Sequence, residues 1–113
     1  MAKTKTPKKA SLVEVITFLA PVQLHRAGAD EPEVVNLNFK YVAPEDLVKR
    51  LDELGPMTPA GAVLDMATGW DMDEPFEKEH VEKLCRVYYG VGQAAIDGLI
   101  QGLAPARVGN FGQ

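Results

Sequence analysis

The spacing of the apolar residues changes once along this chain, at Pro44. Before Pro44, apolar and polar residues alternate from Val35 to Tyr41, and this period of two is typical of a strand with one face on a core and the other in water. After Pro44, apolar residues recur every three or four positions, as in amphipathic helices. A chain of 113 residues can bury one core of this kind. We therefore predict an α+β fold, in which an N-terminal antiparallel β-hairpin or small sheet packs against about four C-terminal helices.

A first strand is predicted over residues 12–24, where β-branched and apolar side chains occur on both faces. Pro21 cannot donate a hydrogen bond to a ladder, so this strand lies at an edge, or it ends or bulges near Pro21. Polar residues 25–33 predict a loop before the second strand. Because two strands alone are marginally stable, helices must cover their apolar face, or a partner must supply further strands.

Four helices are predicted from their helical spacing, from proline and threonine at their starts and from glycine at their ends. The first runs from Pro44 to a stop at Gly55-Pro56, and the second is capped by Thr58 and runs to Gly69. The third begins at residue 73 or 74 and reaches residue 88, and the fourth covers about residues 93–103. We expect three parts: a disordered basic tail (1–10), a single domain (11–103) and a loose C-terminal tail (104–113).

The charge distribution bears on the class of partner. Four lysines lie in the first ten residues and all sixteen acidic residues follow them, so the remainder carries a net charge of −8. An acidic body argues against a nucleic-acid partner, because duplex binding depends on lysine and arginine neutralising phosphates. A lysine arm that touches DNA phosphates stays as an alternative, and its binding would weaken with salt.

Two further features concern the compartment. No apolar stretch approaches the ~20 residues of a membrane helix, and the N-terminal lysines are not followed by the apolar region of a signal peptide. The single cysteine, Cys85, cannot form an internal disulfide, which indicates a reducing compartment. We expect a cytoplasmic protein with no membrane partner.

Two motifs suggest ligand chemistry, but their contexts do not fit. Residues 90–95 match G-x-G-x-x-A, yet a dinucleotide site needs flanking strands and an acidic residue about 20 positions later. We interpret these glycines as a helix junction. Asp71 and Asp73 with Glu82 hint at a calcium loop, but Pro75 and Phe76 stand where a ligand and a glycine belong, so we expect these acids to cap a helix.

Catalytic and metal sites are not predicted. Cys85, His25 and His80 have no metal-ligand spacing, and Cys85 falls in the apolar stripe of the third helix, where it acts as a small hydrophobic residue. No nucleophile motif or phosphate loop is present. We therefore expect a protein that is not an enzyme and needs no cofactor.

Aromatic residues suggest a contact surface. Trp70 is either an exposed anchor for a partner or a core side chain between two helices. Tyr88 and Tyr89 are about 100° apart on a helix, so at least one reaches the surface.

The C-terminal half resembles phage tail assembly chaperones. Over residues 66–110 the resemblance is carried by Gly69-Trp70-Asp71, Phe76, Leu84, Tyr88, Ile96 and the ending Ala106-Arg107-Val108-Gly109-Asn110. The chain departs from the family pattern at residues 90–92, where glycines occupy a junction often filled by proline and alanine. The N-terminal half agrees with the family only in outline.

The resemblance implies a non-enzymatic phage or prophage factor that binds the tape measure protein in the host cytoplasm and keeps it soluble until tail tube subunits assemble around it. We expect its groove on the third and fourth helices, although Phe76 and Leu99 can equally fill the core. The candidate contacts are Trp70, Phe76, Tyr88, Tyr89 and Leu99. The alternative is a structural tail-completion or connector subunit that forms homo-oligomers, with the hairpin adding strands to a neighbour.

Overall fold

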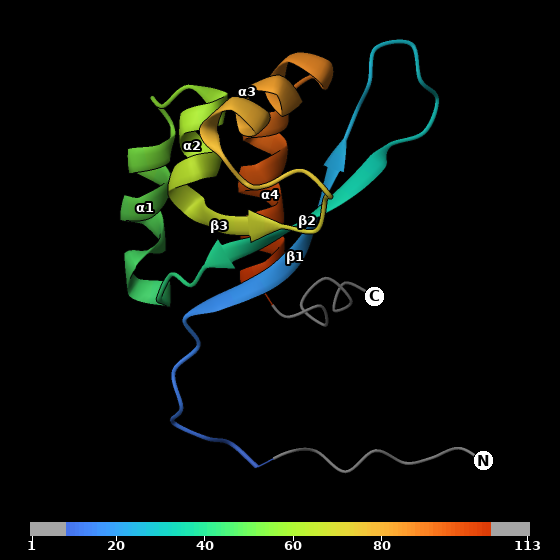
Figure 1. Cartoon of the computed structure of the whole chain (residues 1–113). Coiled ribbons are helices and arrows are strands. Elements are labelled where there is room, and N and C mark those ends of the chain that lie inside the picture. Colours follow the sequence, from blue (N-terminus) through green and yellow to red (C-terminus); the bar gives the residue numbers. More distant parts are fainter. Residues whose placement is uncertain (1–8, 105–113) are drawn as a thin grey trace, which may run out of the picture.

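A computed structural model describes residues 9–104 and shows a three-stranded antiparallel sheet whose one face is covered by helices (Figure 1). This confirms the predicted α+β class. The predicted tails, 1–10 and 104–113, lie outside the described residues except for residues 9, 10 and 104. The elements are, in chain order, β1 (Thr17–Leu24), β2 (Glu33–Lys40), a 3₁₀ turn (Pro44–Asp46), α1 (Leu47–Leu54), α2 (Pro59–Met66), β3 (Ala67–Trp70), α3 (Lys78–Val87) and α4 (Val91–Leu103).

The sheet has the order β1-β2-β3, so β1 is an edge strand. Pro21 lies opposite Asn36 within the β1–β2 ladder, which confirms the edge-strand alternative for this proline. The register runs from Thr17 opposite Lys40 to Leu24 opposite Glu33. Proline is tolerated here because every second residue of an edge strand directs its backbone groups away from the neighbouring strand.

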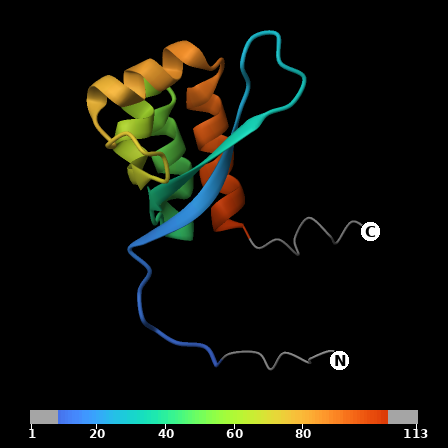
Figure 2. The same cartoon turned by 45° about the vertical axis from the view of Figure 1, so that its right-hand side comes forward.

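The core lies between the sheet and the helices. Figure 2 shows the helices on one side of the sheet, and alternate strand residues facing them are buried: Ala20, Val22, Leu24, Val35, Leu37 and Phe39. Helix α4 packs along β1 and comes close at Gly98, where a Cβ atom would lie 2.9 Å from Cγ2 of Val22 and 3.0 Å from the carbonyl oxygen of Pro21. The glycine therefore sets the distance between α4 and the edge strand.

Several predicted boundaries were wrong. The first strand begins at Thr17 instead of residue 12, and residues 67–70 form β3 instead of the end of the second helix. The strand pairing stabilises β3: the Asn38 side chain donates to the hydroxyl of Thr68 at 3.1 Å, and that hydroxyl donates to the Asn38 carbonyl at 3.3 Å. Such a four-residue strand depends on its partner for its conformation and has no periodic signal of its own.

The start of α3 also differs from the prediction. The helix begins at Lys78, with Glu77 in an extended conformation before it and no side-chain cap. Residues 73 and 74 therefore do not open the helix, and the expectation that these acids cap it was wrong. By contrast, Thr58 caps α2 as predicted, accepting a hydrogen bond from the backbone N–H of Gly61 at 3.1 Å.

Candidate partner-binding surfaces

The turn after β3 is anchored to the sheet by Asp71. Its carboxylate accepts hydrogen bonds from the backbone N–H of Asn36 at 3.0 Å and from Asn36 Nδ2 at 2.8 Å. The backbone hydrogen bond, and after it the side-chain one, lowers the pKa of Asp71 below its ordinary value, because both stabilise the ionised form. Asp71 therefore works as a structural acceptor that joins the turn to β2.

The same turn is held from both ends by two ring nitrogens, one on Trp70 of β3 and one on His80 of α3. Trp70 Nε1 donates to the carbonyl of Glu74 at 2.6 Å, and the indole meets the Phe76 ring edge-on, with centroids 5.1 Å apart and planes at 86°. His80 Nδ1 lies 2.8 Å from the carbonyl oxygen of Pro75. Trp70 is half-buried against the core. Trp70 therefore lies on β3 at the margin of the core, and its contact with a partner stays a prediction.

A groove of about 300 Å³ lies between this turn and α3. We call it the α3 groove. Met72, Leu84, Val87 and Tyr88 provide apolar surface, while Glu74, His80 and Lys83 supply polar groups. An apolar surface with a few polar groups at one site is the usual composition of a binding groove.

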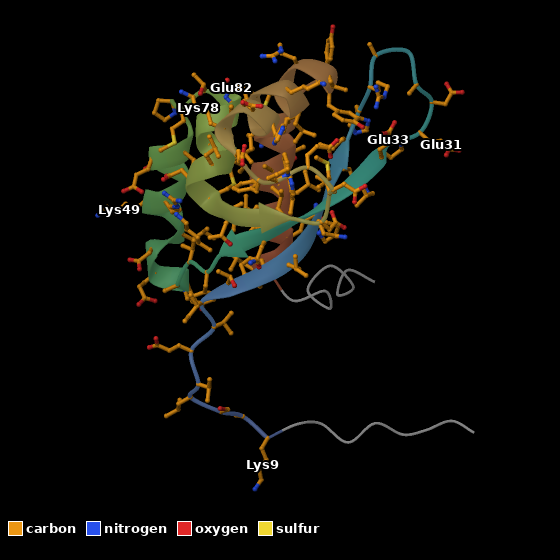
Figure 3. The ribbon with its side chains drawn as sticks, in the orientation of Figure 1. Lys9, Glu31, Glu33, Lys49, Lys78 and Glu82 are labelled. Atoms are coloured by element: carbon orange, nitrogen blue, oxygen red, sulfur yellow. The ribbon has the colours of Figure 1, made fainter. Side chains whose placement is uncertain are left out.

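Tyr88 lines the α3 groove and also contacts the β1–β2 hairpin. Its hydroxyl donates to the Glu33 carboxylate, and Arg26 lies over the ring, with Cζ 4.8 Å from the centroid. Arg26 also donates to the Tyr88 oxygen at 2.9 Å and to Glu33 at 3.2 Å. Figure 3 shows Glu33 on the hairpin beside the helices.

These contacts shift two pKa values in opposite directions. The Tyr88 hydroxyl, followed by Arg26, lowers the pKa of Glu33, because both donate hydrogen bonds to the ionised carboxylate. The carboxylate in turn raises the pKa of Tyr88, since it accepts the phenolic proton. Charged Glu33 and neutral Tyr88 therefore stabilise each other.

A second groove, of about 410 Å³, lies between β1 and α4. We call it the edge groove. Pro21, Gln23 and His25 form its strand side, and Asp97 lies on its helix side. Tyr89 lines it at one end, where its backbone N–H donates to the His25 carbonyl at 2.9 Å. Tyr88 and Tyr89 thus line different grooves, whereas the sequence suggested one continuous groove.

The predicted contact residues are consequently separated. Leu99 has an exposed fraction of 0%, so it fills the core and is removed from the candidate contacts. Phe76 and Trp70 are half-buried and pack on each other. Tyr89 is 70% exposed, in line with the expectation that one of the two tyrosines reaches the surface.

Of the glycines predicted to form a helix junction, Gly90 lies between α3 and α4, whereas Gly92 lies in the first turn of α4. Gly90 precedes α4 and has a positive φ of 67°, a conformation that favours glycine over other residues.

Cys85 packs against the core, and burial, with a smaller effect from Glu82, raises the pKa of its thiol. Within residues 9–104, no group of three or more His, Cys, Asp or Glu side chains is arranged to hold a metal ion. No helix in this part of the chain is long and apolar enough to cross a bilayer.

The largest exposed apolar segment was not among the predicted contacts. Residues 12–16, which we call the apolar arm, lead away from the sheet and helices in Figure 1, and Figure 3 shows Lys9 at the far end of this segment. The exposed fractions are 100% for Leu12, 83% for Val13, 51% for Val15 and 78% for Ile16. A sequence signal was available, because the second strand is too short to pair with 13 residues.

The comparisons with known proteins extend beyond the C-terminal half. A family model described as "Phage tail assembly chaperone" matches residues 1–110. Neither a comparison with curated proteins nor one with solved structures found a match. The family match includes the apolar arm, the sheet and all the helices, and therefore covers far more than the motif in residues 66–110. On this match, the chain belongs to the phage tail assembly chaperone family.

Proposed function

We propose that this chain binds the tape measure protein of a phage tail in the host cytoplasm and keeps it soluble until tail tube subunits assemble around it. The family assigns a chaperone role in tail assembly. The observation that carries the choice of surface is the α3 groove, where the half-buried side chains of Met72, Val87 and Tyr88 lie beside polar ones. A tape measure protein is a long helical chain with apolar faces, and such a helix can place one face in a groove of this kind.

The charges around the groove support a helical client with basic residues. Six of the twelve residues from 71 to 82 are acidic, and only Lys78 is a permanent cation among them. Glu74 lines the groove itself. An acidic surround attracts positive side chains, and a net negative body opposes aggregation of the complex through like-charge repulsion.

The binding test uses two methionines in different places. Met72 lines the α3 groove, whereas Met57 is exposed in the α1–α2 turn. We expect the full-length chain to co-purify with the tape measure protein from cells that express both. Met72→Glu should lower the recovery at least about tenfold, since it places a charge in the apolar contact, and Met57→Glu should not change it.

Folding of both variants is checked by thermal unfolding. Equal recovery with wild type, Met72→Glu and Met57→Glu would show that the α3 groove is not the binding site. Should Met72→Glu fail to fold, Lys83→Glu on the same groove gives the readout, and it should strengthen recovery because it replaces a cation with an acidic group beside a basic client helix. Failure of the wild-type chain to retain the tape measure protein would overturn the proposed function.

A second candidate function is favoured by the apolar arm. An exposed apolar strand can add to a neighbouring subunit, as a structural tail-completion or connector protein would require. Rings of many copies, formed by the purified chain alone, would support this candidate over the chaperone role.

A further inference from the structure

The apolar arm extends beyond the end of its partner strand. The backbone N–H of Tyr41 donates to the Ile16 carbonyl at 2.9 Å, and within residues 9–104 this is the last backbone hydrogen bond between the arm and the chain after β2. Pro44 then opens the 3₁₀ turn, so the chain turns away where β2 would otherwise continue. Residues 12–15 are left without a described strand beside them on that side.

A gap of about 590 Å³ takes the place of the missing strand, and we call it the strand gap. Residues 11–15 form one side of it, and Tyr41, Ala43 and Asp46 form the other. Because one side of the gap is the continuation of a strand, the gap suits an extended segment that lies in line with β2.

The backbone of the arm offers hydrogen bonds to such a segment. In an antiparallel pair, residues alternate between those that bond to one neighbouring strand and those that face away from it. Ile16 bonds toward β2, so Glu14 and Leu12 face the strand gap when the arm continues β1 as an extended strand. No other described residue bonds to the backbone of these two. The β-branched residues Val13 and Val15 favour the extended conformation.

The charges in the strand gap indicate the kind of segment that it binds. Among its described lining residues only Glu14 and Asp46 are charged, and neither forms an ion pair with another described residue. Glu14 is also the single polar residue of the arm. On an added strand, the side chain opposite Glu14 lies on the same face of the sheet, where a lysine or arginine would pair with the carboxylate.

We propose that the strand gap binds an extended segment of a partner protein in which one lysine or arginine is flanked by apolar residues. The segment runs antiparallel to the arm, and its cation lies opposite Glu14 in the gap that Asp46 also lines. Apolar residues of the segment lie opposite Val15 on one side of the cation and opposite Val13 and Leu12 on the other.

A different protein is favoured over a second copy of this chain as the occupant. Two antiparallel arms with Glu14 opposite Glu14 would oppose like charges. A register that places Lys9 opposite Glu14 sets the small residues at positions 10 and 11 against the apolar residues at positions 13 and 12. A register that places an apolar residue of the arm there leaves the carboxylate without a cation.

Titration of the isotopically labelled full-length chain with synthetic peptides, followed by NMR, tests the proposal. The probe is acetyl-Ser-Val-Lys-Val-Leu-Ser-amide, and its twin carries glutamate in place of lysine. We expect amide shifts in residues 12–15 and about tenfold tighter binding of the lysine peptide, since its twin opposes like charges. Glu14→Lys should reverse this preference. The matched control, Glu31→Lys, makes the same charge change on the hairpin, at the opposite end of the molecule from Lys9 in Figure 3, and should retain the preference.

Two methylated forms of the lysine peptide test the strand pairing. In the proposed register the backbone N–H of the lysine faces the arm, and that of the following valine faces away from it. Methylation of the lysine nitrogen in the backbone should weaken binding at least about tenfold, because it leaves the Glu14 carbonyl without its donor. Methylation of the valine nitrogen should change the affinity by less than about twofold.

Three results would overturn the proposal: no shifts in residues 12–15 with either peptide at millimolar concentration, an unchanged preference in Glu14→Lys, or equal effects of the two methylations. Self-association of the free chain through the arm that excludes the lysine peptide would assign the strand gap to a second copy and would also overturn it. Binding in the strand gap does not depend on tape measure binding, because Glu14 lies outside the α3 groove.

Discussion

The helical half of the chain and the apolar arm use apolar residues in opposite ways. The helical half carries the residues that resemble the family and that were expected to contact a partner, yet Leu99 is fully buried and Trp70 packs on Phe76. The arm was predicted to be part of the first strand, yet it lies before β1, and Leu12 and its neighbours are exposed. Apolar residues near a family motif are therefore not automatically contact residues, and the less typical segment exposes more apolar surface.

The same substitution in the two regions should give the largest difference in stability. Leu99→Ala removes a completely buried side chain and should lower the free energy of unfolding by about 2–5 kcal/mol, through lost burial and a cavity. Leu12→Ala, at a fully exposed position, should change it by less than about 0.5 kcal/mol. Urea unfolding at low protein concentration measures both. Comparable losses would mean that the arm is covered within a single copy.

A smaller effect is expected where the helical half meets the edge strand. Gly98→Ala forces a methyl group against Val22 and the Pro21 carbonyl, and overpacking of this kind costs about 1–3 kcal/mol. The matched control is Gly69→Ala in β3, where an added Cβ meets nothing within 4 Å. Thermal unfolding of both variants tests this. If Gly98→Ala unfolded at the same temperature as the wild type, α4 would be able to move away from β1 without a loss of stability.

Acid should weaken the link between the helical half and the sheet. The pKa of Asp71 is lower in the folded chain than in the unfolded chain, so its stabilising effect is present above the unfolded pKa and is lost as the pH falls through the folded pKa. Asp71→Asn should therefore reduce the loss of stability between pH 5 and pH 2, by an amount smaller than the Gly98→Ala effect. The matched control is Asp73→Asn in the same turn, because the hydrogen bonds to Asn36 are made by Asp71. Denaturant midpoints of the wild type and of both variants, measured across this pH range, test this prediction.

The fold was predictable from sequence where periodicity or capping chemistry is local. The alternation from Val35 to Phe39 and the cap at Thr58 each act through neighbouring residues, and both were recovered. The strand β3 and the turn after it depend on distant partners, Asn36 and Asn38 across the sheet. No short window of sequence contains both partners of such a contact, so β3 was missed. The turn that delays α3 is held by local contacts, from Trp70 to Glu74 and from His80 to Pro75, which helical periodicity does not reveal.

The candidate site was less predictable than the fold for a related reason. Helical spacing gives the face on which Tyr88, Tyr89 and Leu99 lie but does not say what covers that face. The structure gives three outcomes: Leu99 packs beneath the sheet, Tyr88 bonds to the hairpin, and Tyr89 is exposed. Exposure depends on the distant elements β1 and β2.

The smallest effect is expected from removing the hydroxyl group of Tyr88 or of Tyr89, two residues whose exposure the sequence did not distinguish. Tyr88→Phe keeps the ring under Arg26 but removes the hydroxyl that donates to Glu33, so the hairpin loses one of its contacts with α3. Global stability should change little, because Glu33 and Arg26 are solvent-exposed and retain their own pairing. Amide exchange in residues 26–32 should nevertheless become several-fold faster, because the base of the hairpin opens more often. Tyr89→Phe should leave it unchanged, since Tyr89 contacts His25 through its backbone. Equal protection in both variants would mean that the hairpin is held by its own ladder and is independent of the helical half.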